Sequence, residues 1–143
     1  MKLHKMLSIT ASMLAIAIML PVVHADDWNQ ATRFTFTQPV QIPGRVLPAG
    51  TYRFQLADND SRHLVQIFRE DRTLVATLYS IPRLRDGRSA DAAITLADRG
   101  AAQPQAIVAW FFGGETQGHE LLYARQGKQA LARATQTTFM SGK

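Results

Sequence analysis

The stretch RVLPAGTYRFQL, from Arg45 to Leu56, combines a turn signal with an alternating polar and apolar pattern. Pro48 presets one backbone dihedral angle and Gly50 permits a positive φ, so the pair predicts a tight turn. After the turn, Tyr52 and Phe54 alternate with polar residues, which is the two-residue period of a strand with one buried face. The stretch therefore predicts an opening hairpin of a β-fold.

The same alternation recurs on both sides of this stretch. Together with residues 51–57, strand patterns cover residues 32–38, 40–42, 63–70, 73–81, 92–97, 105–112 and 119–124. The connections are too short for the crossover helices that parallel strands need. The pattern predicts an all-β, mainly antiparallel barrel or sandwich of about seven to eight strands.

The end of the chain differs from the rest. Residues 125–135, RQGKQALARAT, are rich in helix-forming residues and contain one large apolar side chain, Leu131. They predict one short C-terminal helix that packs lightly against the sheet. Residues 137–143 are polar and predict a flexible tail, so that residues 26–136 form a single domain.

The first 25 residues have the pattern of a secretory signal peptide. Lys2 and Lys5 precede a short apolar run that is broken by Pro21, and Ala25 offers a small residue at the cleavage position. A membrane anchor would need about 20 uninterrupted apolar residues. We therefore expect an exported protein, periplasmic or extracellular, that does not span the membrane after cleavage.

Composition excludes several classes of function. The chain has no cysteine, so it has no disulfide, thiolate metal site or cysteine nucleophile. The full chain carries a formal charge of +5, of which about +3 remains after the signal is removed. This net charge is small for a nucleic-acid-binding protein. The sequence contains no glycine-rich phosphate loop, so no nucleotide cofactor is predicted.

The layout resembles a group of small secreted bacterial proteins that is frequent in acidobacteria-like genomes. The resemblance lies in LPAGTYRFQLAD, HLVQIFREDRTLVATLYSIPR, AWFFGGETQGHELLYAR and ALARA, which lie between residues 47 and 134. It implies a β-rich fold with an LPAGTY hairpin and a C-terminal G-x-E-aromatic segment, and it implies export. It implies no reaction. Two positions depart from the pattern, Arg72 at a glycine position and Gly113 at a proline or tyrosine position.

Catalytic and metal sites are not predicted. His63 and His119 are the histidines that follow the signal, and their spacing matches no metal motif. No serine lies in a nucleophile elbow. Paired carboxylates near Glu115 and Glu120 leave a small hydrolase as the alternative, although Glu120 also suits an ion pair that fixes strand register.

The candidate ligand-binding residues are Arg83, Arg85, Arg88, Trp110, Glu120 and Tyr123. The three arginines surround one turn, where guanidinium groups can bind a carboxylate or phosphate. Trp110 would stack on a ligand if its face were open, and otherwise belongs to the core.

These patterns favour an exported non-enzymatic module of the bacterial cell envelope. It would bind another envelope protein or a small apolar or anionic ligand. An apolar cavity lined by Trp110, Tyr79 and Phe112 would favour a small ligand. A filled interior with an open strand edge would favour contact with a protein.

Overall fold

The computed structural model describes residues 31–57 and 62–140. The signal peptide predicted for residues 1–25 and the last three residues lie outside this part. The strands are β1 (Thr32–Phe36), β2 (Val40–Ile42), β3 (Arg45–Leu47), β4 (Gly50–Leu56), β5 (Leu64–Arg69), β6 (Leu74–Leu84), β7 (Ala93–Ala97), β8 (Gln105–Phe111), β9 (Gln117–Leu121) and β10 (Gln136–Met140). The helix α2 spans Arg125–Arg133. The predicted all-β fold with a short C-terminal helix is confirmed.

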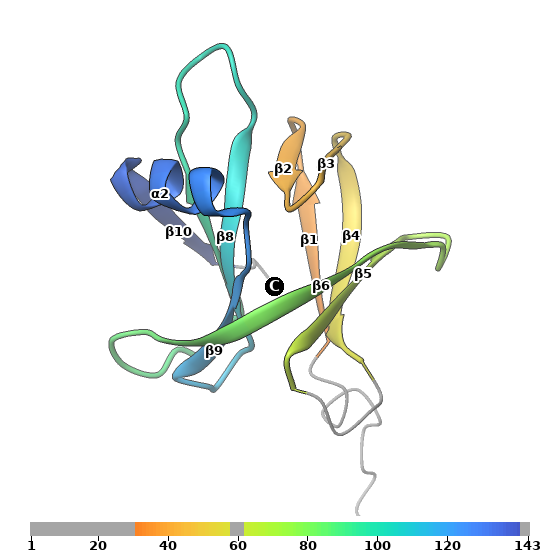
Figure 1. Cartoon of the computed structure of the whole chain (residues 1–143). Coiled ribbons are helices and arrows are strands. Elements are labelled where there is room, and N and C mark those ends of the chain that lie inside the picture. The colour runs from red at the N-terminus through yellow and green to blue at the C-terminus, as the bar shows by residue number, and fades with distance from the viewer. Residues whose placement is uncertain (1–30, 58–61, 141–143) are drawn as a thin grey trace, which may run out of the picture.

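The strands form two layers that are joined along one side by the long strand β6 (Figure 1). One layer runs β1-β4-β5-β6 and the other runs β6-β9-β8, with β7 and then β10 extending it beyond β8. The first half of β6 pairs with β5, and its second half, from Ser80, pairs with β9. Every pairing is antiparallel except the short contact between β2 and β8.

The core lies between the layers and follows the predicted alternation. Phe34 and Phe36 of β1 and Tyr52 and Phe54 of β4 are all buried, while the residues between them are more exposed. Trp110 of β8 is fully buried among them. The period of two therefore identified the inward face of both strands correctly.

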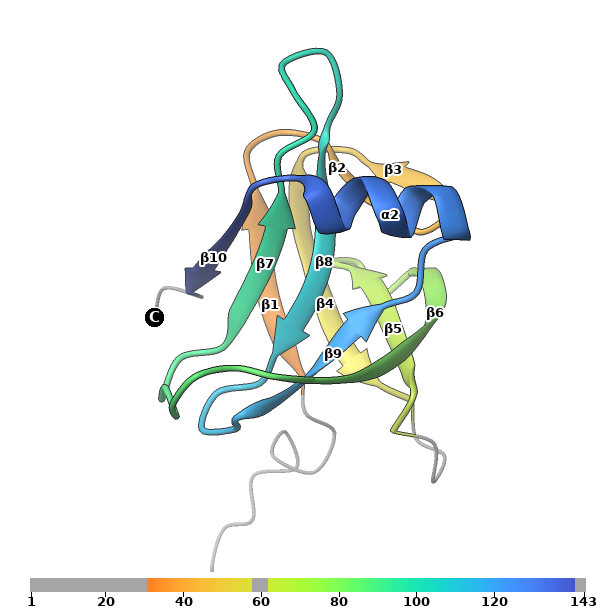
Figure 2. The same ribbon diagram turned by 60° about the vertical axis from the view of Figure 1, so that its left-hand side comes forward.

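A second, smaller cluster lies on the other face of β7 and β8. There α2 crosses the sheet (Figure 2) and packs Leu131 against small side chains, including Ala93, Ala106 and Ala109. This is the light packing that the helix sequence predicted. The helix covers the face opposite Trp110.

The structure differs from the flexible tail that the sequence predicts from residue 137. Residues Gln136–Met140 form β10, which pairs antiparallel with all of β7. The Oγ1 atoms of Thr95 and Thr138 lie 2.9 Å apart across this pairing. Threonine is favoured in strands, and β7 offers an edge to pair with, so a polar segment becomes a strand here.

The stretch from Arg45 to Leu56 is not a hairpin. β3 pairs with β2, whereas β4 pairs with β1 and β5, so the turn carries the chain between the two layers. The hydroxyl of Tyr52 donates a 2.7 Å hydrogen bond to the carbonyl of Pro48 and holds this corner. Gly50 has φ of +155°, a conformation that side-chain-bearing residues rarely adopt. The turn residues were predicted correctly, but the pairing was not.

Arg72, in the turn between β5 and β6, is the one non-glycine residue of the described chain with a positive φ, at 68°. We expect Arg72→Gly to raise the free energy of unfolding by about 0.5–1 kcal/mol, because glycine enters the left-handed region without a steric cost. Arg72→Ala keeps the strained Cβ and should bring no such gain. Urea denaturation of both variants measures the difference, and equal stability of the two would contradict this reason.

Of the part of the chain that the structure describes, no helix has the length and apolar character needed to cross a bilayer.

Candidate functional site

A groove separates the first strand of one layer from the last strands of the other. Its volume is about 530 Å³. It is lined by β1 and the segment after it, by β7, by the start of β8 and by the end of β10; the lining residues are Arg33, Phe34, Thr35, Phe36, Thr37, Gln38, Pro39, Val40, Ile94, Leu96, Gln105, Phe139 and Met140. On this side the two layers are not joined by a shared strand.

The groove has an apolar floor and an exposed apolar rim. Phe34 and Phe36 from β1 and Ile94 and Leu96 from β7 are buried and belong to the main core. Phe139 and Met140 at the end of β10 are 47% and 53% exposed. Because both side chains line the cavity as well as being exposed, this groove is the candidate binding surface.

This site was not predicted from the sequence, because residues 137–143 were interpreted as a flexible tail. The signal that could have found it is the run TTFM from Thr137 to Met140, where β-branched and large apolar residues follow a helix. Such a run is typical of a strand that presents apolar side chains.

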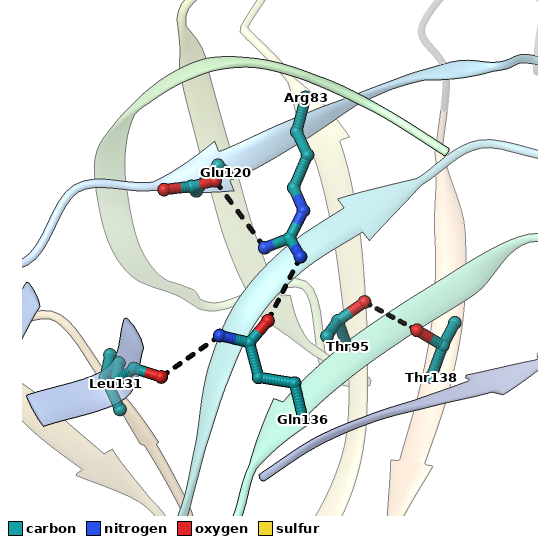
Figure 3. Close-up of polar contacts among 6 residues, drawn as sticks. All are labelled: Arg83, Thr95, Glu120, Leu131, Gln136 and Thr138. Carbon is teal, nitrogen blue, oxygen red and sulfur yellow. Dashed lines mark hydrogen bonds and ion pairs between the residues drawn. The ribbon is translucent and has the colours of Figure 1, made fainter. Parts of the chain in front are cut away.

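Arg83 and Glu120 form the strand-bridging ion pair that the sequence suggested for Glu120 (Figure 3). Arg83 Nη1 lies 3.5 Å from Glu120 Oε2, and Arg83 Nη2 donates a 3.0 Å hydrogen bond to Gln136 Oε1. Gln136 Nε2 donates in turn to the carbonyl of Leu131. The network fastens the start of β10 to β6, β9 and the helix, so Arg83 and Glu120 are engaged with neighbours.

Arg85 is engaged with the backbone of two loops. Its guanidinium donates to the carbonyls of Glu115, Ser89 and Phe112 at 2.9, 3.1 and 3.4 Å. The same group lies 5.3 Å from the ring centroid of Phe111, at cation–π distance. Arg88, in contrast, is exposed. The three arginines that sequence placed around one turn therefore do not converge on one site.

Trp110 and Tyr123 both point inward. Trp110 is 0% exposed, which assigns it to the core rather than to an open stacking face. The Tyr123 hydroxyl lies 2.7 Å from the carbonyl of Ile107 and 3.1 Å from that of Gln41. Burial raises the pKa of this hydroxyl. Tyr123 thus ties the β2 and β8 backbones together.

Ser80 and His119 form a buried polar pair where β6 changes partners. His119 Nδ1 lies 3.4 Å from Ser80 Oγ, and that oxygen lies 3.2 Å from the carbonyl of His63. The imidazole also packs against Trp110, with ring centroids 5.4 Å apart. Burial, with smaller contributions from the charges of His63 and Arg62, lowers the pKa of His119 below its ordinary value of 6.5.

This lowered pKa predicts that the protein loses stability as the pH falls. The unfolded chain protonates His119 at a higher pH than the folded chain does, so the contribution is fully present above pH 6.5 and is lost toward the folded pKa. Thermal melting between about pH 7 and pH 5 measures the slope. In His119→Gln the slope should flatten, and an unchanged slope would contradict the assignment.

The carboxylates do not gather in a cleft. Glu115 is exposed in the turn after β8, Glu120 pairs with Arg83, and neither lines the groove. Within residues 31–57 and 62–140, no group of three or more His, Cys, Asp or Glu side chains is placed to bind a metal ion.

Comparison of the chain with protein-family models, with curated proteins and with solved structures found no match.

Proposed function

We propose that this chain is an exported module of the cell envelope that acts by binding another protein, and that the groove between β1 and β10 is its binding site. The observation that carries the proposal is the exposed pair Phe139 and Met140 beside a cavity between two strand edges. The export part rests on the pattern of residues 1–25.

A filled interior supports a protein partner over an enclosed small ligand. Trp110 and Phe54, the largest fully buried side chains, occupy the space between the layers. Tyr79 is 69% exposed on the outside, so it does not join Trp110 around a cavity. The open feature is at the edge of the fold, and strand edges are surfaces that other chains recognise.

The alternative function, a hydrolase that uses Glu115 and Glu120, has less support. A glycoside hydrolase needs two carboxyl groups on either side of one substrate bond, within about 10 Å of each other across a cleft. The backbone carbonyl of Glu115 accepts a hydrogen bond from Arg85, and the carboxylate of Glu120 faces Arg83. No observation favours a second function.

Native mass spectrometry of the protein purified from its host's envelope tests the proposal. The wild-type chain is expected to retain a partner of defined mass. The double variant Phe139→Ser, Met140→Ser should lose it, because it removes the apolar rim. Tyr79→Ser, which removes an exposed aromatic residue from another face, should keep it. A bare wild-type monomer, or equal retention by all three proteins, would overturn the proposal.

A further inference from the structure

Both strands that border the groove have a free edge. Within the described residues, β1 pairs with β4 alone and β10 pairs with β7 alone. In an antiparallel pair only alternate residues direct their N–H and C=O groups at the partner, so the others point away from it. All five residues of β1 are paired with β4, and its other edge faces the groove side without a strand partner.

We propose that the partner enters the groove as an extended β-strand that pairs with the free edge of β1. The inference rests on the proposed function, since it names what the groove binds. Backbone hydrogen bonds would supply affinity, and alternate side chains would supply specificity, as in other cases of strand addition. β1 spans five residues, Thr32–Phe36, so its free edge suits a peptide segment of about five residues.

The groove fixes which side chains the added strand carries on its inner face. Every second residue of a strand points to the same side. On β1 the inward-pointing residues are Phe34 and Phe36. They line the same groove as the exposed Phe139 and Met140. The inner residues of the partner strand are therefore apolar.

The charge of the groove lining predicts which residues the partner strand carries on its outer face. Arg33 is the single charged residue among those that line the groove, and no acidic residue accompanies it. It is exposed on the outer face of β1, opposite Phe34 in the alternation. Opposite charges on neighbouring strands attract, whereas like charges repel. The partner strand thus carries acidic residues on its outer face, alternating with the apolar ones.

A fluorescein-labelled, capped peptide in which valine alternates with glutamate and threonine probes this inference. We expect saturable binding in fluorescence anisotropy. Two matched peptides carry N-methyl groups on alternate backbone amides, one on the odd-numbered and one on the even-numbered residues. Both keep the side chains, but one of them loses the hydrogen bonds to β1 and should bind at least about tenfold more weakly than the unmethylated peptide. Arg33→Glu should weaken binding of the unmethylated peptide, and added salt should weaken it in the wild type.

The outcomes separate this inference from the proposed function. Equal binding of the peptide and of both methylated registers would overturn strand addition while leaving the groove as a binding site. Absence of peptide binding, together with a natural partner lost in the Phe139→Ser, Met140→Ser variant, would overturn the strand chemistry alone. A complex of two copies of this chain, seen by analytical ultracentrifugation without peptide, would assign the edge to self-association and also overturn the inference.

Discussion

Replacing Trp110 with alanine is expected to lower the free energy of unfolding by about 3–5 kcal/mol. The indole is fully buried in the core between the two layers, with its ring centroid 6.2 Å from that of Phe54 and 5.4 Å from that of His119. Alanine would leave a cavity between two layers that are joined through β6, and such layers cannot fully collapse. Chemical denaturation with tryptophan-independent detection, such as far-ultraviolet circular dichroism, measures the loss.

A matched variant separates packing from polarity. Among the described residues, Trp110 Nε1 is buried without a hydrogen-bond partner. Trp110→Phe removes this N–H group and keeps most of the ring, so its cost should stay near about 1–2 kcal/mol, well below that of alanine. If Trp110→Ala melted at the wild-type temperature, the side chain would not be in the core. Trp110 would then again be a candidate for stacking on a ligand, as its sequence context allowed.

Local alternation predicted which residues face inward, because burial and the two-residue period are both set within one strand. The inward positions of β1 and β4 follow from this period. The helix could also be predicted, because RQGKQALAR contains no strand-forming residues and has one apolar anchor, Leu131.

Strand pairing could not be predicted in the same way, because it depends on residues far apart in the chain. Pro48 and Gly50 define a turn, but a turn does not say whether its two arms pair with each other. Here β3 and β4 join different partners, and β2 lies parallel to β8. The run TTFM around Thr138 is compatible with a strand, but it does not show by itself that β10 pairs with the edge of β7.

The candidate site shows the same limit. Arginine clustering suggested a ligand, but the sequence cannot show that backbone carbonyls already surround Arg85 or that Gln136 reaches Arg83. The groove was missed because it combines the first described strand with the last one. A site formed by the two ends of a fold has no local motif.

Arg85→Ala is expected to cost about 2–3 kcal/mol, the second large effect. The substitution removes a charged donor that binds carbonyls from both the 85–92 loop and the turn after β8. These carbonyls lose a shared partner, and the stacking on Phe111 is lost as well. We expect the loss of stability to be greatest in the two loops that Arg85 joins. The Gly114 amide, which donates to the carbonyl of Ser89 at 2.7 Å, should therefore exchange its hydrogen with solvent faster than in the wild type. Hydrogen exchange and urea denaturation measure the two effects.

Two further variants test whether geometry, rather than charge alone, explains the role of Arg85. Arg85→Lys keeps the positive charge but has one nitrogen in place of three, so it should recover only a minor part of the loss. Arg88→Ala removes an exposed arginine from the same loop and should change stability by less than about 0.5 kcal/mol. Equal stability of the Arg85 and Arg88 alanine variants would mean that the carbonyl contacts contribute nothing. The arginines would then again be candidates for binding an anionic ligand, as their spacing first suggested.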